Sequence, residues 1–399
     1  MRFALSIFYR DIIIDDLKNI PSNKPSIFAC THPNSFLDAI IIGAYSPRKL
    51  YFLARSDVFN TPFKMWLLSN MNLIPIYRLQ EGAENLHKNE VTFAKCFEIM
   101  KKGGSILIFS EGISVTDKLV RPLKKGTARI AFGAEVYNNF KLDLQIIPMS
   151  LNYTYPSLFR SEVIVGIKEP IAVKKYQTLY EESEMKAIRQ FNQDLYDGIK
   201  ASSIIVDEKT DAGKTYEIIA PILRSELNDH KKRLFKEQQW AEKSTQENII
   251  SLAANYPMQP SSLLENKIKK KSVEVLNQLL VSLTFAIFWL IGYLPNAIPF
   301  VFAKIITKKL VKLIEFYASV RLCLSVVLYL IYLPIVSFII SSFVGINFAL
   351  VAILFIALGS IYVKIRDEYR SIIGAKKFFS NENSEELISI RNKVITEFV

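Results

Sequence analysis

Short apolar runs alternate with segments of helical spacing along the first half of the chain. Runs typical of buried strands occur at 26–30, 49–54, 73–77, 105–110, 145–153 and 162–167. Helical segments separate the first five of these runs; they start near 35 and cover 62–71, 91–102 and 127–137. Strands that alternate with helices predict a layered α/β domain with a mostly parallel sheet. We assign residues 1–175 to this domain.

The first residues, MRFALSIFYRDIII, allow two interpretations. The segment is basic and apolar, which fits an amphipathic helix lying on a membrane surface. It equally fits a first element of the core. The pattern alone leaves both alternatives open.

Beyond the α/β domain the chain changes character twice. Residues 176–275 are rich in charge and have helical spacing without apolar strand runs, so we expect a solvated helical linker. Two long segments after it contain no charged residue, one between Glu274 and Lys304 and one between Arg321 and Lys364. The second holds two apolar segments, 322–340 and 344–363, each long enough to cross the hydrocarbon core of a membrane. They predict a pair of transmembrane helices.

The segment 279–303 is less clear, because prolines interrupt it. Lysines flank it on both sides, and positive charge marks the cytoplasmic side of a membrane. About 25 residues cannot cross a bilayer twice. We therefore expect a re-entrant hairpin turning at Pro295–Pro299, with a kinked crossing helix as the alternative. The predicted membrane region is 276–365, followed by a cytoplasmic tail, 366–399.

Composition supports a membrane protein. Charged residues make up 22% of the chain and the net charge is +12, yet the mean hydropathy is +0.19. A basic chain suits nucleic acid or an anionic membrane surface, and the apolar C-terminal half favours the membrane. No basic helix with interleaved aromatic residues indicates a nucleic-acid partner. The three cysteines and three histidines lack the spacing of disulfide frameworks or metal sites, so we expect no bound metal.

Candidate chemistry lies at the first strand-to-helix joint, ACTHPNSFLDAIII. The histidine side chain has an unperturbed pKa of about 6.5, so His32 is a residue that can accept a proton near neutral pH. Asp38 falls in the first turn of the following helix, which Asn34 or Ser35 could cap. From there it can hold the imidazole as an oriented base, which suits activation of a substrate hydroxyl. Ser35 and Cys30 are alternative nucleophiles, and a purely structural His–Asp hydrogen bond is the other interpretation.

Further motifs follow in a fixed order along the chain. Arg78 ends the strand LIPIY, Glu111 and Gly112 follow the strand ILIF, and Pro148 lies inside the strand IIPMS. Together with HPNSFLD, this set resembles the glycerophospholipid acyltransferase family, which includes the acyltransferases for glycerol 3-phosphate and lysophosphatidate. The resemblance covers residues 15–170.

The resemblance implies an acyltransferase fold and a role for each matching residue. His32 would be the general base and Asp38 its orienting partner. The substrate-binding residues would be Arg78, which clamps a phosphate, together with Glu111, Gly112, Ser114, Lys124 and Lys125. A guanidinium is well shaped for phosphate, whereas Lys124 and Lys125 are nearby cations that could take its place.

The chain departs from the family pattern at three points. Five residues separate the histidine from the aspartate instead of four, which is similar to the fungal glycerol-3-phosphate acyltransferases. Ser110 stands where the third motif has proline. Ile113 and Ser114 stand where an arginine is common.

The resemblance implies a membrane-bound enzyme of phospholipid biosynthesis. It would transfer a fatty acyl group from acyl-CoA or acyl carrier protein to glycerol 3-phosphate or 1-acylglycerol 3-phosphate, without a cofactor. We expect a multi-pass membrane protein with the catalytic domain on the cytoplasmic face. The alternatives are an acyltransferase for another lysolipid and an inactive membrane tether or lipid-binding protein. The intact His32, Asp38, Arg78 and Glu111 argue against an inactive site.

Overall fold

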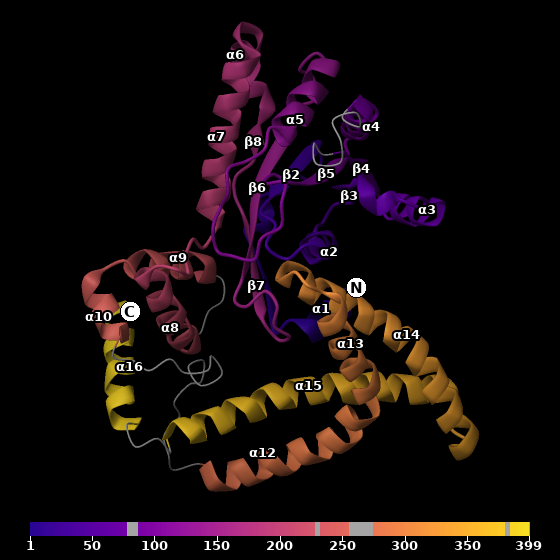
Figure 1. The fold of residues 1–399 in the computed structure, drawn as a ribbon, viewed down its shortest axis with the longest axis vertical. Coiled ribbons are helices and arrows are strands. Elements are labelled where there is room, and N and C mark those ends of the chain that lie inside the picture. Colours follow the sequence, from indigo (N-terminus) through magenta and orange to yellow (C-terminus); the bar gives the residue numbers. More distant parts are fainter. Residues whose placement is uncertain (78–86, 228–231, 255–273, 380–383, 399) are drawn as a thin grey trace. The chain divides into compact units, whose positions relative to one another are not determined.

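The computed structural model describes residues 1–77, 87–227, 232–254, 274–379 and 384–398 (Figure 1). The chain divides into two compact units, Met1–Ile205 and Val206–Val399. The first unit contains the sheet, and the second is helical in its described residues.

An eight-stranded sheet is the centre of the first unit, in the order β1-β7-β6-β2-β5-β3-β4, with β8 paired to β6. Its strands are β1 (Asp11–Asp15), β2 (Ser26–Cys30), β3 (Leu50–Arg55), β4 (Leu73–Ile76), β5 (Ser105–Phe109), β6 (Gln145–Tyr153), β7 (Glu162–Ile167) and β8 (Ile171–Ala172). The strands β4, β3, β5, β2 and β6 are mutually parallel, whereas β7 and β8 run antiparallel to β6. The predicted mostly parallel α/β sheet is confirmed.

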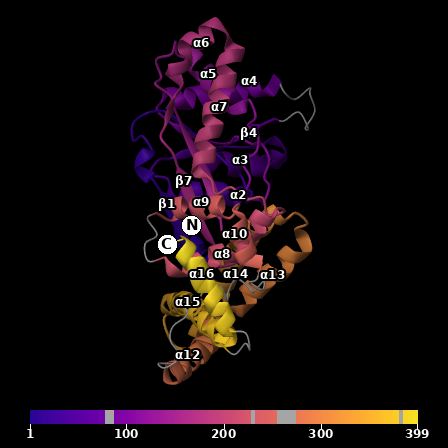
Figure 2. The same cartoon turned by 90° about the vertical axis from the view of Figure 1, so that its left-hand side faces the viewer.

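Helices cover both faces of the sheet. They are α1 (Arg2–Phe8), α2 (Phe36–Tyr45), α3 (Pro62–Asn70), α4 (Asn89–Lys101), α5 (Gly126–Tyr137), α6 (Gln177–Glu182) and α7 (Glu184–Ser202). Alternate residues of the strands, such as Ile27 and Ile106, pack against α4, α5 and α7. Figure 2 shows α7 lying along the sheet. Residues of the opposite parity face α2, where Phe52 of β3 lies against Gly43.

The N-terminal segment is an element of the core. Leu5 and Phe8 of α1 and the following Tyr9 are buried. The next residues form β1, which pairs in parallel with β7. The core interpretation of this segment is therefore the one that the structure supports, because its apolar side chains face the sheet unit.

The first unit extends to Ile205, beyond the boundary at 175 that the charge pattern indicates. Every fourth residue of α7 from Ala187 to Ile199 is buried in the core of the sheet unit, although the helix is highly charged. Its apolar stripe packs on the sheet, and its charges face solvent. The charge pattern alone predicts a linker here, because the charged residues outnumber the apolar residues of the stripe.

The helices α8 (Asp211–Glu226), α9 (Arg233–Lys243), α10 (Glu247–Ala254) and α16 (Ser384–Phe398) pack on one another in the second unit. Glu237 of α9 is their buried ionic centre, 3% exposed. Its carboxylate accepts hydrogen bonds from Tyr216 at 2.7 Å and from Arg224 and Arg233 at 2.8 Å. This packing differs from the solvated linker expected for the region.

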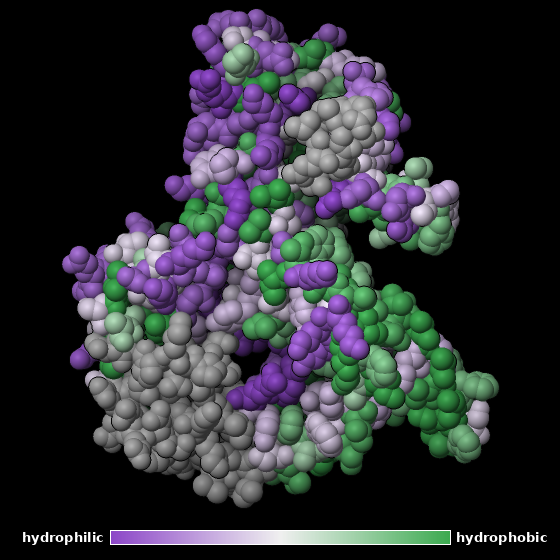
Figure 3. Space-filling model, in the orientation of Figure 1, coloured by the Kyte–Doolittle hydropathy of each residue, from purple (hydrophilic) through white to green (hydrophobic). Residues whose placement is uncertain are grey.

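Three helical segments are long and apolar enough to cross a membrane: Ser282–Leu310, Ile314–Val344 and Phe348–Asp367. They belong to α12 (Glu274–Phe288), α13 (Ala297–Leu310), α14 (Tyr317–Val344) and α15 (Phe348–Phe379). Figure 3 shows apolar side chains on the surface of α13 and α14. The helices α14 and α15 pack side by side and are joined at Gly345, whose φ is +72°, so they form the predicted helical hairpin.

The segment 279–303 is a kinked helix. A π-helical turn, Trp289–Tyr293, and a 3₁₀ turn, Leu294–Asn296, separate α12 from α13. The two arms pack on different helices, α12 on α15 and α13 on α14, rather than on each other. At the break Asn296 Nδ2 donates to the carbonyl oxygens of Gly292 at 2.7 Å and Phe355 at 3.2 Å. The described residues therefore show a break near Pro295, and whether the segment re-enters or crosses a membrane stays a prediction.

Candidate active site

The His–Asp joint lies at the carboxyl end of β2, in the middle of the sheet. His32 follows the strand by two residues, and Asp38 is in the first turn of α2. Nδ1 of His32 lies 2.9 Å from Oδ2 of Asp38. The side chain of Asp38 is fully buried, whereas that of His32 is 18% exposed. The pair therefore joins a buried acceptor to a base that substrate can reach.

Asp38 accepts two further hydrogen bonds. The backbone N–H of Asn34 donates to Oδ2 at 2.8 Å, and the hydroxyl of Tyr153 donates to Oδ1 at 2.7 Å. With donors around it, the carboxylate acts as an acceptor, and Nδ1 of His32 carries the shared proton. The lone pair then lies on Nε2, which has no hydrogen-bond partner among the described residues. This is the arrangement of an oriented general base.

The cap of α2 differs from the expected one. Ser35 is the N-cap residue but makes no side-chain cap hydrogen bond, and its φ of 50° and ψ of −143° are unusual for a residue with a Cβ. Asp38 instead accepts the N–H of Asn34, the residue before the N-cap. One carboxylate thus both fixes the loop before the helix and orients the histidine.

The imidazole ring is fixed from a second side by the end of β5. Phe109 stacks on the ring of His32 with centroids 3.7 Å apart and planes 11° from parallel. Phe109 is the first residue of the third motif, FSEG. Two motifs that lie far apart in sequence therefore meet at one histidine, because β2 and β5 are adjacent parallel strands.

The segment after the third motif holds the histidine loop in place. Ser114 Oγ accepts a hydrogen bond from the N–H of Ser35 at 2.9 Å. The Thr116 hydroxyl donates to the carbonyl oxygen of Pro33 at 2.9 Å, and the N–H of Val115 donates to that of His32. Ser114 was expected to bind substrate. The structure places it beside the catalytic loop as a support, and its role toward substrate stays a prediction.

Glu111 and Gly112 lie directly beside the histidine loop. Glu111 is buried, and its Oε1 accepts the backbone N–H of Arg121 at 3.1 Å. Burial raises the pKa of Glu111, and the Arg121 N–H partly offsets that rise. Gly112 has a φ of +72°, and a Cβ there would lie 3.1 Å from Cγ of Lys124. Glycine thus allows both the turn and the close approach of Lys124.

Of the three basic residues expected to bind phosphate, the structure gives positions for the two lysines. Lys124 and Lys125 are exposed at the start of α5, and the N–H of Lys124 donates to the carbonyl oxygen of Ser110. Arg121 pairs its guanidinium with Asp117. Arg78 lies outside the described residues, so the structure gives no position for it.

The alternative nucleophiles do not suit the geometry. Cys30 is fully buried, and burial, followed by the charges of Asp38 and Glu111, raises the pKa of its thiol well above the usual value. A thiol that stays protonated is a weak nucleophile. Ser35 is only 4% exposed. The site therefore favours direct attack by a substrate hydroxyl.

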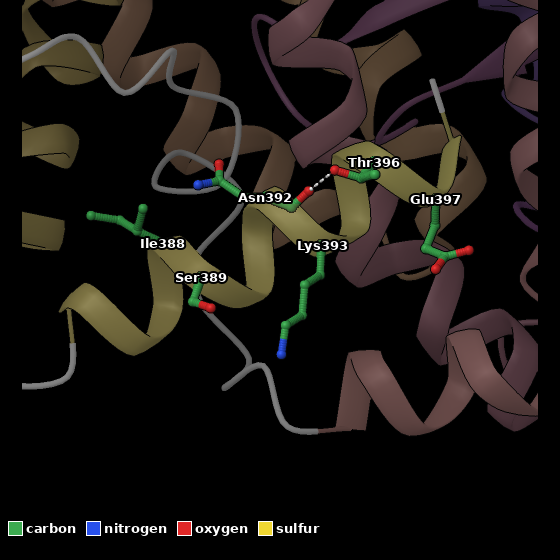
Figure 4. Close-up of a pocket in the computed structure, with 6 residues that line it drawn as sticks. All are labelled: Ile388, Ser389, Asn392, Lys393, Thr396 and Glu397. Atoms are coloured by element: carbon green, nitrogen blue, oxygen red, sulfur yellow. Dashed lines mark hydrogen bonds between the residues drawn. The ribbon is translucent and has the colours of Figure 1, made fainter.

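A hollow in the second unit is lined by none of the site residues. A surface hollow of about 520 Å³ runs along α16 between Ile388 and Glu397, where Thr396 donates to the carbonyl oxygen of its own helix neighbour Asn392 (Figure 4). The cavity that includes His32 and Glu111 is only about 20 Å³. Within the described ranges, no three His, Cys, Asp or Glu side chains converge as metal ligands.

Two tyrosines of the site were not found from the sequence. Tyr153 is the last residue of β6, and the ring of Tyr9 lies 5.9 Å from it. Burial, and then the charge of Asp38, raises the pKa of both hydroxyls well above the usual value, so they remain neutral donors. The available signal was the position of Tyr153 at the carboxyl end of a central strand, the same edge where His32 lies.

Comparison with known proteins gives a family match for part of the chain. Residues 11–152 match the family model described as Acyltransferase. The chain carries an acyltransferase domain. The matched residues include His32, Asp38, Glu111 and Gly112, whereas Tyr9 and Tyr153 lie just outside the match.

Curated relatives carry related names. A chloroplastic 1-acyl-sn-glycerol-3-phosphate acyltransferase of Brassica napus is 28% identical over 189 residues, which are 45% of this chain and 50% of the relative. Glycerol-3-phosphate O-acyltransferase 2 of Saccharomyces cerevisiae is 32% identical over 107 residues, 27% of this chain and 14% of the relative. The crystal structure of the 1-acyl-sn-glycerophosphate acyltransferase PlsC from Thermotoga maritima is 20% identical, with a TM-score of 0.36, over 50% of this chain and 78% of that one.

The aligned part of these proteins is limited to the acyltransferase domain and its surroundings. The chain spans about half the length of the first plant relatives that it matches. The relatives thus identify the domain, and the activity of the whole chain is a matter for proposal.

Proposed function

We propose that the chain is a membrane-bound O-acyltransferase that moves a fatty acyl group from a thioester to a hydroxyl of a phosphorylated glycerol. The observation that carries this proposal is the geometry of His32. Its Nδ1 is held by a buried, fully hydrogen-bonded Asp38, and its Nε2 is free to accept a proton. The acyltransferase domain around it supports the reaction class.

In the proposed reaction Nε2 of His32 accepts the proton of the acceptor hydroxyl as its oxygen attacks the thioester carbonyl. A C–O bond forms, and the tetrahedral intermediate then collapses with cleavage of the C–S bond. The leaving thiolate takes the proton from His32, which yields the ester, a free thiol and the original base. This route needs neither a covalent acyl-enzyme nor a resident cofactor.

The acceptor would be glycerol 3-phosphate or 1-acylglycerol 3-phosphate, and the donor acyl-CoA or acyl carrier protein. The printed names of the plant and yeast relatives support the two acceptors. Arg78, Lys124 and Lys125 would bind the phosphate, while Glu111 and Gly112 would shape the glycerol pocket. Lys124 supports this assignment by its place against Gly112.

The proposal places the catalytic domain on the cytoplasmic side of a membrane. The three long apolar helices support a membrane location. The lysines at 304, 308, 309 and 312 favour the cytoplasm for the end of α13, and Lys364 and Arg366 favour it for the segment after the α14–α15 hairpin. In this topology 322–363 crosses twice, and 279–303 enters and leaves on the same side.

The test is acyl transfer by the purified full chain, with labelled acyl-CoA or acyl carrier protein and three acceptors: glycerol 3-phosphate, 1-acylglycerol 3-phosphate and lysophosphatidylcholine. General-base catalysis contributes about 10²–10⁴-fold, so we expect His32→Ala to lose activity by that factor. The exposed His87 offers a matched control, and His87→Ala should retain full activity. If His32→Ala keeps more than about a tenth of the rate, the base assignment is wrong. No transfer to any acceptor by the unaltered chain would favour a lipid-binding tether.

A further inference from the structure

The helix α3 is apolar and yet buries none of its residues in its own unit. Its sequence is PFKMWLLSN. Phe63 is 67% exposed, Trp66 63% and Met65 55%. The helix is nevertheless well formed, because Pro62 occupies its first turn and Thr61 Oγ1 accepts the N–H of Lys64 at 3.2 Å.

The position of α3 makes this exposure unusual. It connects the parallel strands β3 and β4, and a crossover helix in that position normally packs its apolar side on the sheet. Here α3 contacts mainly β4 and the short 3₁₀ helix η2 (Ser56–Phe59). Only Leu68 is partly buried among the residues of the helix. Something outside this unit must cover the other side chains, or they remain in water.

The distribution of these side chains indicates what covers them. Successive residues of a helix are about 100° apart, so Phe63, Trp66 and Leu67 share one face, whereas Met65, which is exposed as well, lies on the opposite face. A protein groove binds one stripe of a helix, with anchors three and four residues apart. A lipid phase can surround a helix on all sides. The pattern on α3 therefore fits lipid better than a protein groove.

The charge and residue types of α3 agree with a lipid surface. Lys64 is its one charged residue, and the helix contains no acidic side chain. A positive charge is attracted to anionic headgroups, and the whole chain has a net charge of +12. Tryptophan is enriched where one end of a side chain is apolar and the other is wet, as in the interfacial region of a membrane. At the right of Figure 3 apolar side chains lie exposed among polar ones in the region of α3.

We propose that α3 is a membrane-docking helix that inserts its apolar side chains into the interfacial region of a lipid bilayer. The bilayer is available because the same chain contains three segments apolar enough to span one. The strand β3, which leads into α3, ends at the same edge of the sheet as β2 and β5, after which His32 and Glu111 follow. Docking at α3 would bring this edge close to lipid, where acyl chains partition.

The experiment uses Trp66 as a reporter in the full chain. The chain has three tryptophans, so Trp240→Phe with Trp289→Phe leaves Trp66 alone. The protein is reconstituted in vesicles of phosphatidylcholine and phosphatidylglycerol, with or without bromine atoms on the acyl chains near the headgroup. Bromine quenches tryptophan on contact, so we expect Trp66 to lose about half of its emission or more in brominated vesicles. The matched control is Trp66→Phe with Trp289→Phe, because the remaining Trp240 is only 5% exposed and should not be quenched.

A second measurement covers the case in which the tryptophan variants do not fold. A spin label is attached to Met65→Cys in a chain whose native cysteines are replaced. Oxygen, which concentrates in lipid, should reach this label more readily than a water-soluble nickel complex. Quenching no stronger than that of Trp240, or a label more accessible to nickel, would overturn the proposal. Cross-links from position 65 to a second copy of the chain without lipid contact would overturn it as well. Neither measurement requires acyl transfer, so failure here is separate from failure of the proposed function.

Discussion

The hydroxyl of Tyr153 donates a hydrogen bond to Oδ1 of Asp38 at 2.7 Å, and Oδ2 of the same carboxylate lies 2.9 Å from Nδ1 of His32. The tyrosine thus acts on the base through the carboxylate. By stabilising the negative charge of Asp38, it weakens the pull of Asp38 on the imidazole proton. Burial and the charge of Asp38 raise the pKa of Tyr153 well above its usual value, so it remains a neutral donor.

Tyr153→Phe should slow acyl transfer. Without the hydroxyl, Oδ1 of the buried Asp38 loses its donor, and the carboxylate that orients His32 is held less firmly. A hydrogen bond to a charged group contributes about 1.5–3 kcal/mol, so we expect kcat to fall about tenfold or more. The measurement is kcat and the KM of each substrate, and kcat should fall while both KM values stay near those of the unaltered chain.

The control for this change is Tyr137→Phe. Tyr137 is 55% exposed on α5, and its hydroxyl donates to Glu98 rather than to the site. That variant should keep both kcat and the two KM values. If Tyr153→Phe folds normally and its kcat matches that of the unaltered chain, Tyr153 only supports the packing of β6.

Much of the sheet could be predicted from the sequence, because the apolar run of each buried strand is bounded by clear turn residues. The run 145–153 coincides with β6, and 26–30 coincides with β2. The helix α7 could not be recognised as part of this unit, because its apolar stripe is spaced four residues apart within a charged segment. The helix packs on β6, which lies about 40 residues earlier in the chain, and no local sequence pattern indicates that contact.

The candidate site could be predicted only where its residues lie close together in the sequence. His32 and Asp38 are six residues apart, and their hydrogen bond could be anticipated from the geometry of one helix start. Tyr153 is 115 residues from Asp38, and only the pairing of β2 with β6 brings them together. Ser114 likewise meets Ser35 because β2 and β5 are neighbours. Contacts that depend on which strands are adjacent cannot be predicted before the strand order of the sheet is known.

Arg78→Ala should raise the KM for the acceptor more than the KM for the donor. A guanidinium binds phosphate through two parallel hydrogen bonds, and in the proposed site this phosphate belongs to the acceptor. The measurement is initial rate against each substrate in turn. Arg189→Ala, on the exposed face of α7, is the control and should change neither constant. Equal increases in both constants would mean that Arg78 maintains the fold rather than binding the acceptor.

Glu237→Gln should destabilise the second unit at neutral pH. Burial alone would raise the pKa of Glu237, but Arg224 and Arg233 outweigh burial and hold it well below the usual range. A carboxylate with a lowered pKa in the folded state stabilises the fold above its unfolded pKa, about 4.3 for a glutamate. Removing one partner of a buried ion pair costs about 3–5 kcal/mol, because the remaining charges lose their counterion.

The same linkage predicts how this cost depends on pH. As the pH falls below about 4, the unfolded chain binds a proton at Glu237 more readily than the folded chain, and its contribution is lost. The difference in stability between the unaltered chain and Glu237→Gln should therefore shrink there. Unfolding in detergent can be followed by the emission of Trp240, which lies on the same helix. Asp211→Asn, which breaks the exposed pair with Lys214, is the control and should leave unfolding unchanged. A difference that stays constant with pH would contradict a charged Glu237.

The last prediction concerns membrane topology. Lysines cluster at the end of α13, and Lys364 and Arg366 follow the apolar part of α15. If these charges set orientation, the loop after α13 and the C-terminal helix α16 lie in the cytoplasm, and the turn between α14 and α15 lies outside. Single cysteines at Lys308, Ser342 and Ser389, in a chain without its native cysteines, can be treated on intact cells with an impermeant thiol reagent. Position 342 should react, and positions 308 and 389 should react only after the cells are permeabilised.

This experiment also decides between two topologies for the segment 279–303, which either re-enters on the cytoplasmic side or crosses the membrane once. Ser282–Leu310 is long and apolar enough to span a bilayer once, and then all three candidate spans would cross. With the catalytic domain in the cytoplasm, three crossings would expose positions 308 and 389 and hide 342, which is the reverse of the labelling that we expect. The four lysines between 304 and 312 oppose that arrangement, since they would have to pass through the membrane. Reaction at 308 would show that charge does not decide the orientation of this segment, and that the break at Trp289–Asn296 is a bend within a crossing helix.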